Sequence, residues 1–166
     1  MENNEDRVIL IDKPLEWTSF DVVNKLRKKL KIKKIGHAGT LDPLATGLLI
    51  LCTGKMTKRI DEYQAQEKEY TGQLVIGQTT PSHDLETIVS EAKDIAHITN
   101  ELITVASRKF TGTINQIPPI HSAVKIDGKR AYKLARKGKE PELKPRSVLV
   151  SEFEITSIEL PIIKFR

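Results

Sequence analysis

The sequence predicts a domain of mixed helices and strands, an α/β fold of the α+β kind, and three patterns support that class. Apolar residues recur at helical spacing from Phe20 to Leu30, they alternate with polar residues from Tyr70 to Ile76, and Val8 to Ile11 is a short apolar run. The 166 residues are 39% hydrophobic, which is enough for one compact domain and hardly enough for two. We therefore expect a single α+β domain.

In the first half of the chain, the expected elements begin and end at recognisable signals. Thr18 and Asp21 have the spacing of a capping box, which marks the start of a helix. The expected elements are a strand at 8–11, a helix at 20–30, a loop at 36–47, a strand at 48–51 and a short helix at 55–63.

In the second half, strands and turns predominate. One helix is expected from Asn100 to Phe110, with Leu102, Val105 and Ala106 on one face and Gly112 just beyond its end. The other expected elements are a strand at 70–76, an exposed loop at 79–86, a strand and tight turn at 122–128, a short helix at 131–137 and a strand at 148–158.

The charge balance indicates an acidic partner. Lysine and arginine outnumber aspartate and glutamate by 27 to 22, and the net charge of +5 favours nucleic acid. No apolar run approaches the roughly 20 residues that span a membrane, so no membrane association is expected. Cys52 has no partner for a disulfide, which fits a buried, inert thiol and a cytoplasmic location.

One stretch of the chain is strongly basic and contains no acidic residue. We call it the basic segment; its charged residues are Lys25, Arg27, Lys28, Lys29, Lys31, Lys33 and Lys34. Such a run is usually a solvated face of a helix, but it can also contact RNA phosphates, in which case affinity falls as salt is added.

The densest chemical signal is GHAGTLDPLATG, Gly36 to Gly47, which combines glycines, threonines, a histidine and an Asp-Pro pair. Glycine permits close backbone approach to a ligand, and Pro43 disfavours a helical conformation at Asp42. A carboxylate on such a loop can act as a nucleophile, although an Asp-Pro pair also commonly caps a helix. The local residues leave both interpretations open.

Four segments resemble the bacterial tRNA pseudouridine synthase B family, and together they are spread over nearly the whole chain. They are DKPLEWTS at 12–19, GHAGTLDPLATGLLIL at 36–51, KEY at 68–70 and QIPPIHSAVKIDGKRAYKLARKG at 116–138. The resemblance implies the pseudouridine synthase catalytic fold, a mixed and largely antiparallel sheet with flanking helices. It also implies isomerisation of uridine to pseudouridine at position 55, in the T arm of tRNA.

The resemblance gives roles to particular residues. Asp42 matches the catalytic aspartate of the family's Gly-x-Leu-Asp-Pro loop, which acts after the target base has been flipped out of the RNA. Tyr70 matches the tyrosine expected to stack on that base, and His37 matches the histidine that contacts the RNA where the base has left. Lys13 and Pro14 belong to a motif expected to support the catalytic loop. No metal or organic cofactor is implied; tRNA is the expected partner, and no protein partner is predicted.

Two departures from the family pattern bear on these roles. Glu16 stands where many members have glycine, so a positive backbone dihedral is harder to adopt there. The family also continues beyond Arg166 with an arginine that pairs with the catalytic aspartate. Residues 1–166 are therefore expected to be a partial catalytic domain, without its C-terminal part and without any RNA-binding domain.

Two other functions stay open from the sequence. The chain can be a non-catalytic RNA-binding fragment, in which case Asp42 has no catalytic duty. It can also be a glycoside hydrolase, although that chemistry ordinarily needs two carboxylates and none lies beside Asp42 in the sequence. Release of free uracil from RNA would distinguish hydrolysis from isomerisation.

Overall fold

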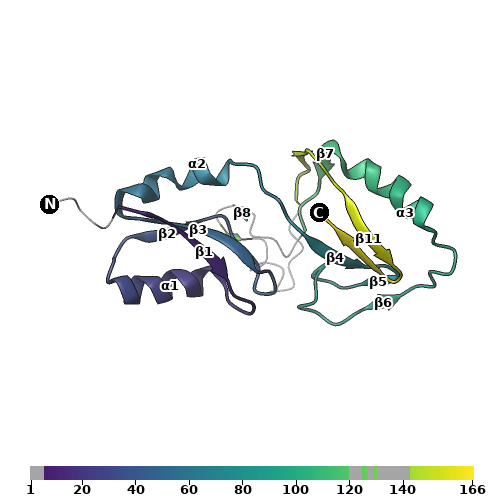
Figure 1. The fold of residues 1–166 in the computed structure, drawn as a ribbon, viewed down its shortest axis with the longest axis horizontal. Helices are drawn as coiled ribbons and strands as arrows, with labels where there is room; N and C mark the ends of the chain where they lie inside the picture. The colour runs from purple at the N-terminus through teal and green to yellow at the C-terminus, as the bar shows by residue number, and fades with distance from the viewer. Residues whose placement is uncertain (1–5, 120–124, 127–128, 131–142) are drawn as a thin grey trace. The chain divides into compact units, whose positions relative to one another are not determined.

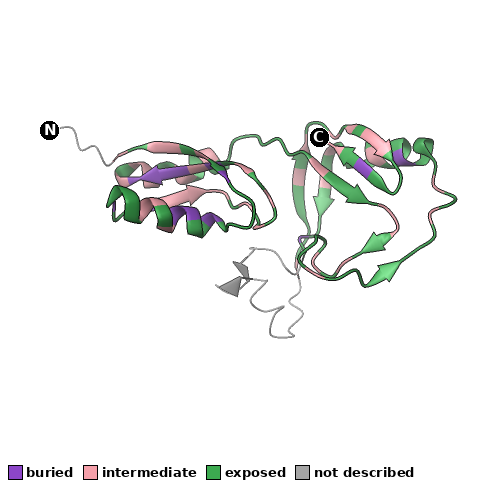
Figure 2. Cartoon of the chain, turned by 60° about the horizontal axis from the view of Figure 1, so that its bottom comes forward, coloured by how far each residue is buried: buried purple, intermediate pink, exposed green. Residues whose placement is uncertain are grey.

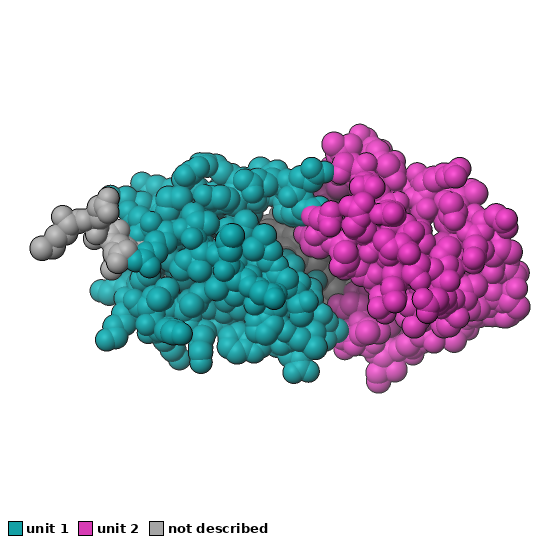
Figure 3. Space-filling view, in the orientation of Figure 1, with its two compact units in different colours: residues 1–68 teal, residues 69–166 magenta. Residues whose placement is uncertain are grey.

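The computed structural model describes residues 6–119, 125, 126, 129, 130 and 143–166. The fold has the expected α+β character, and the strand pairings within this described part are antiparallel. The chain forms two compact units, residues 1–68 and residues 69–166 (Figure 3). The composition predicts one compact domain, whereas the structure divides between Lys68 and Glu69. Residues 65–69 are exposed and mostly polar, so this stretch offers little apolar surface for packing.

In the first unit, a three-stranded sheet carries a helix on each face (Figure 1). Its elements are β1 (Val8–Lys13), α1 (Ser19–Leu30), β2 (Ile35–Ala38), β3 (Gly47–Thr53), η1 (Gly54–Arg59) and α2 (Ile60–Gln64). The strand order is β1-β3-β2, with Val8 opposite Cys52 and Ile35 opposite Thr53. The strands predicted at 8–11 and 48–51 and the short helix predicted at 55–63 are confirmed, each with small differences in length.

Helix α1 begins at the predicted capping box. The Asp21 backbone N–H donates to the Thr18 hydroxyl at 3.1 Å, and the Thr18 backbone N–H donates to the Asp21 carboxylate at 2.9 Å. Val22 and Val23 are buried and belong to one apolar cluster with residues of β2 and β3. Because burying a valine or leucine side chain contributes roughly 1.5–3 kcal/mol, this cluster fixes α1 on the sheet.

Strand β2 occupies the start of the loop predicted at 36–47, so that prediction is wrong for residues 36–38. Gly36, His37 and Ala38 pair with residues 50–52 of β3. Gly36 resembles a chain breaker in the sequence, but in the sheet its missing side chain makes room for α2. A Cβ atom there would lie 2.9 Å from Cδ1 of Ile60.

Buried residues of the first unit lie on β3 (Leu49, Leu51 and Cys52) and on α1 (Val22 and Val23); Figure 2 colours buried residues purple. Leu51 and Cys52 have no exposed surface. Burial raises the pKa of the Cys52 thiol, because a thiolate is disfavoured away from water. The expectation of a buried cysteine is confirmed.

The described residues of the second unit form short antiparallel sheets and the helix α3 (Figure 1). Its sheets have the orders β11-β12-β4, β10-β7, β5-β6 and β8-β9. The elements are β4 (Gly72–Val75), β5 (Gln78–Thr79), β6 (Glu91–Ala92), α3 (Asn100–Ser107), η2 (Arg108–Phe110), β7 (Gly112–Gln116), β8 (Lys125–Ile126), β9 (Lys129–Arg130), β10 (Arg146–Val150), β11 (Ile155–Glu159) and β12 (Ile162–Phe165). Within the described residues, no helix is long and apolar enough to cross a membrane.

Two predictions for this unit are corrected. The strand expected at 148–158 is two strands, β10 and β11, because the chain leaves its pairing with β7 at Ser151 and pairs with β12 from Ile155 onwards. In α3, Ile103 is buried, whereas Leu102 and Val105 are 52% and 55% exposed. The helix expected at 131–137 lies outside the described residues, as does most of the strand and turn expected at 122–128.

Candidate active-site loop

Asp42 lies on the connection between β2 and β3, residues 39–46, which we call the Asp42 loop. Gly39, its first residue, and Gly47, the first residue of β3, have φ values of +94° and +112°, a backbone region that favours glycine. Inside the loop, the backbone N–H of Ala45 donates to the carbonyl oxygen of Asp42 at 3.0 Å. The loop, which connects two paired strands, therefore contains a tight turn at residues 42–45.

The residues on both sides of Asp42 are held by the connection between β1 and α1. Ser19 is buried, and its hydroxyl accepts a hydrogen bond from Leu41 N–H at 3.0 Å and lies 3.2 Å from the Leu41 carbonyl oxygen, to which it can donate. The backbone N–H of Glu16 donates to the carbonyl oxygen of Pro43 at 2.8 Å. The backbone at Asp42 is thus fixed from Leu41 and from Pro43.

The side chain of Lys13 also contacts the Asp42 loop. Its side chain is fully buried at the end of β1. Burial lowers the pKa of the Lys13 ammonium group, and the Asp42 and Asp21 carboxylates act in the opposite direction. The ammonium donates to the carbonyl oxygens of Pro14 at 3.0 Å, Trp17 at 2.5 Å and Pro43 at 3.4 Å. The predicted support of the loop by this motif is therefore confirmed as a set of hydrogen bonds.

The side chain of Asp42 remains exposed. Among residues 6–119 and the other described positions, no hydrogen bond or ion pair to its carboxylate is present. Lys13 is near enough for its charge to interact with Asp42. A carboxylate on a fixed backbone, with no hydrogen bond or ion pair in the described part of the chain, is available to a substrate.

Glu16 adopts a left-handed backbone conformation, which is costly for a residue other than glycine. Its φ is +65°, in the left-handed region that disfavours side chains by roughly 1–2 kcal/mol. The conformation directs the Glu16 N–H to the carbonyl oxygen of Pro43. The strain is therefore located in a residue that holds the Asp42 loop.

His37 lies on β2, in the same unit as Asp42, and is half-buried. Its Nδ1 makes a short hydrogen bond with the carbonyl oxygen of Gly39. Because a carbonyl oxygen only accepts, Nδ1 donates the hydrogen of this bond, and Nε2 is left for another partner. The strand and this bond fix the orientation of the imidazole.

Tyr70 belongs to the second unit and comes two residues before β4. The sequence pattern predicts Tyr70 as the first residue of a strand, but pairing with β12 begins only at Gly72. The Tyr70 side chain is 58% exposed. The structure thus brings His37 and Asp42 into one unit and describes Tyr70 within the other.

Ser19 is the site residue that sequence reasoning missed. It follows the N-cap residue Thr18, where a serine is easily interpreted as part of the helix start. Its position in DKPLEWTS was the available signal, but the bond to Leu41 joins residues 22 apart in sequence. Within the described residues, no group of three or more histidine, cysteine or acidic side chains is placed to hold a metal ion.

Comparison with known proteins gives a consistent family match. Residues 27–166 match the model of a family described as TruB family pseudouridylate synthase (N terminal domain). The tRNA pseudouridine synthase B of Parabacteroides distasonis is 55% identical, over 96% of this chain and 70% of that protein. The protein of the same name from Flavobacterium johnsoniae is 54% identical, over 98% of this chain and 74% of that protein.

Two solved structures contain chains with a similar fold. A chain in the crystal structure of a Cbf5-Nop10-Gar1 complex superposes with a TM-score of 0.68 at 28% identity, over 95% of this chain and 37% of that chain. A second, in the structure of an H/ACA RNP bound to a substrate RNA containing 2′-deoxyuridine, has a TM-score of 0.62 at 25% identity. It covers 95% of this chain and 36% of that one.

Proposed function

Because the chain belongs to the TruB family of pseudouridylate synthases, we propose that it isomerises uridine to pseudouridine at position 55, in the T arm of tRNA. The family, the fold and the class of enzyme expected from the sequence motifs are confirmed. The relatives' name, tRNA pseudouridine synthase B, supports tRNA as the substrate, and we place the reaction in the cytoplasm.

We assign the catalytic role to Asp42. Pseudouridine formation breaks the bond between N1 of uracil and C1′ of the ribose, turns the base, and joins C5 to the same sugar carbon. The C5 hydrogen then leaves as a proton, and N1 gains one. A carboxylate serves this reaction as a nucleophile or as the counter-charge to a cationic sugar.

One observation carries this assignment. Asp42 is exposed, while its two neighbours, Leu41 and Pro43, are held by hydrogen bonds from Ser19 and Glu16. Catalytic groups need a fixed backbone and a side chain that is free to meet the substrate. A helix-capping aspartate would instead accept hydrogen bonds from backbone N–H groups, and no such bond is present within the described residues.

The other two predicted residues receive binding roles in the same proposal. His37 offers Nε2 to the RNA where the target base has been extracted, with its ring held through Nδ1. Tyr70 offers an exposed ring on which the flipped base stacks. Both contacts offset part of the stacking that is lost when the base leaves the RNA.

The test measures hydrogen release from an unmodified T-arm RNA that carries tritium at C5 of uridine. We expect release with the wild-type chain, loss with Asp42→Asn, and normal release with Asp61→Asn, a matched control on α2 of the same unit. RNA binding without release, both by the wild-type chain and by a chain that continues beyond Arg166, would refute catalysis by Asp42 and favour a non-catalytic RNA-binding module. Release of free uracil would instead indicate a glycoside hydrolase.

A further inference from the structure

We propose that Arg166 is a positioning residue for Tyr70, and that it acts by binding Glu69, the residue directly before Tyr70. The proposal rests on the proposed function, since it concerns the ring that would receive the target base. It adds the way in which the chain holds that ring.

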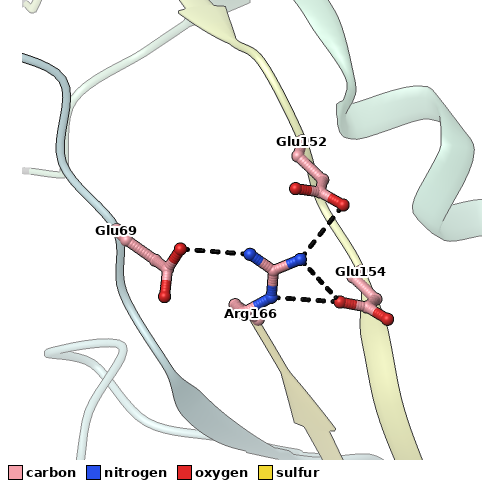
Figure 4. A network of polar contacts seen from close by, with 4 residues as sticks. All are labelled: Glu69, Glu152, Glu154 and Arg166. Atoms are coloured by element: carbon pink, nitrogen blue, oxygen red, sulfur yellow. Dashed lines mark hydrogen bonds and ion pairs between the residues drawn. The ribbon is translucent and has the colours of Figure 1, made fainter.

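Arg166 lies at the centre of a cluster of three glutamates, which Figure 4 shows in close-up. Its Nη1 donates to Glu69 at 3.0 Å, and its Nη2 lies 3.1 Å from Glu152 and 2.9 Å from Glu154. Its Nε donates to Glu154 at 3.1 Å. Hydrogen bonds to Glu154 and Glu69 raise the pKa of the Arg166 guanidinium, which is in any case charged at neutral pH.

The backbone of Arg166 is itself fixed. Its N–H and carbonyl groups each form a hydrogen bond of 2.9 Å with the backbone of Glu154. Glu152 and Glu154 belong to the short connection between β10 and β11, whereas Glu69 lies on the segment that leads into β4 (Figure 4). The Arg166 guanidinium therefore links Glu69, the residue before Tyr70, to a part of the chain whose backbone is already held by hydrogen bonds.

A second anchor lies on the other side of Tyr70. Gly72 is opposite Phe165 in the pairing of β4 with β12, and a Cβ atom on Gly72 would lie 2.6 Å from the Phe165 ring. That ring packs against Phe153, with 5.5 Å between ring centroids. Tyr70 thus stands between two fastened residues, Glu69 and Gly72, while its own ring remains exposed. This is the preorganisation that a stacking platform needs.

The positioning role and simple electrostatics predict opposite effects on RNA binding when Glu69 is replaced. The three glutamates outnumber the single guanidinium, so the cluster is negative beside a residue expected to meet RNA. On electrostatics alone, replacing any one of them with glutamine tightens RNA binding. If Glu69 holds Tyr70 in place, its replacement has the opposite effect.

The first experiment measures the Kd of an unmodified T-arm stem-loop in the Asp42→Asn background, which prevents turnover. We expect Glu69→Gln and Arg166→Gln to weaken binding about 5-fold, part of the contribution of one base stack. Glu152→Gln removes the same charge from the same guanidinium and serves as the matched control, with binding unchanged or slightly tighter. Equal tightening in Glu69→Gln and Glu152→Gln would overturn the proposal.

The second experiment needs no RNA and separates this proposal from the proposed function. The chain has three tyrosines, so fluorotyrosine labelling gives few ¹⁹F NMR signals, and Tyr70→Phe identifies the one of interest. We expect Glu69→Gln and Arg166→Gln to shift or broaden the Tyr70 signal, Arg166→Lys to restore it in part, and Tyr63 to stay unchanged. An unchanged Tyr70 signal overturns the positioning role even in an active enzyme. A changed signal in a protein that releases no C5 hydrogen supports positioning and refutes only the function.

Discussion

Replacing Ser19 with alanine tests whether the β1–α1 connection holds the Asp42 loop. Ser19 is 2% exposed, and its hydroxyl accepts from the N–H of Leu41 at 3.0 Å and lies 3.2 Å from its carbonyl oxygen. Ser19→Ala removes both contacts and leaves the two backbone groups of Leu41 without this partner. The loop then keeps its anchors on the Pro43 side and loses its anchor on the Leu41 side.

The magnitude follows from these contacts. Each neutral hydrogen bond contributes about 1 kcal/mol, and a buried group left without a partner costs about 1–3 kcal/mol. Because Leu41 is half-buried, water reaches part of its backbone, and we expect a loss of about 2–3 kcal/mol in the free energy of unfolding. A displacement of about 1 Å in a catalytic group costs up to about 100-fold in rate. With one side of the loop still anchored, we expect kcat to fall about 10-fold.

The assay uses the single tryptophan, Trp17, which lies two residues from Ser19 and therefore reports unfolding of the first unit. Urea unfolding followed by its fluorescence gives the stability of that unit, and C5 hydrogen release gives kcat. Thr57→Val is the matched control in the same unit, since the Thr57 hydroxyl donates within its own helix, to the Gly54 carbonyl oxygen at 2.7 Å, in the contacts described. We expect that variant to stay within about 0.5 kcal/mol of the wild type.

The reasoning fails if Ser19→Ala unfolds at the same urea concentration as the wild type and retains its kcat. A loss of stability with unchanged kcat would show that the hydroxyl stabilises the fold without positioning Asp42. A fall in kcat that exceeds the fall in folded fraction is the result that supports positioning.

Three further predictions follow from other features of the first unit and its charges. Glu16→Gly relieves the strain of a positive φ, about 1–2 kcal/mol, against a glycine entropy cost of about 0.5–1 kcal/mol. Thermal melting should therefore show a small stabilisation, whereas the adjacent control Leu15→Gly should destabilise. Hydrogen bonds from Thr18 lower the pKa of Asp21, so their contribution to stability is present above about pH 3.8 and is lost as pH falls through the folded-state pKa. Urea unfolding should show that Asp21→Asn is less stable at neutral pH and depends less on pH in acid. In filter binding over a salt series, Lys28→Gln should reduce the salt dependence of RNA affinity by about one phosphate contact, and Lys93→Gln in the second unit should not.

Local signals predicted much of the first unit. The capping box at Thr18 and Asp21 places the start of α1 within one residue of the expected one, because the interaction involves residues three apart. Strands β1 and β3 are apolar runs that need no knowledge of their partners. The sequence patterns did not predict β2, because its glycines indicate a loop, whereas the strand depends on its pairing with β3, which no local pattern reveals.

The same limit applies to α3. Its sequence offers two apolar faces, one through Leu102 and Val105 and one through Ile103, and helical spacing alone does not choose between them. The structure buries Ile103 because α3 packs against β11, which is more than 50 residues later in the chain. The orientation of a helix is therefore set by its tertiary partner, whereas its ends are set locally.

For the site, sequence motifs indicated Asp42, and the structure supplies the reason that two separate motifs are needed. DKPLEWTS contributes Lys13, Glu16 and Ser19, and all three bond to the backbone of the residues that flank Asp42. None of these bonds is visible in sequence, since they join positions 22 to 30 apart. The motif DKPLEWTS supports the backbone on both sides of Asp42 through these hydrogen bonds, and this role requires no contact between its buried residues and RNA. A substitution in DKPLEWTS is therefore expected to change catalysis by displacing Asp42. A substitution at Asp42 is expected to change catalysis while leaving these hydrogen bonds intact.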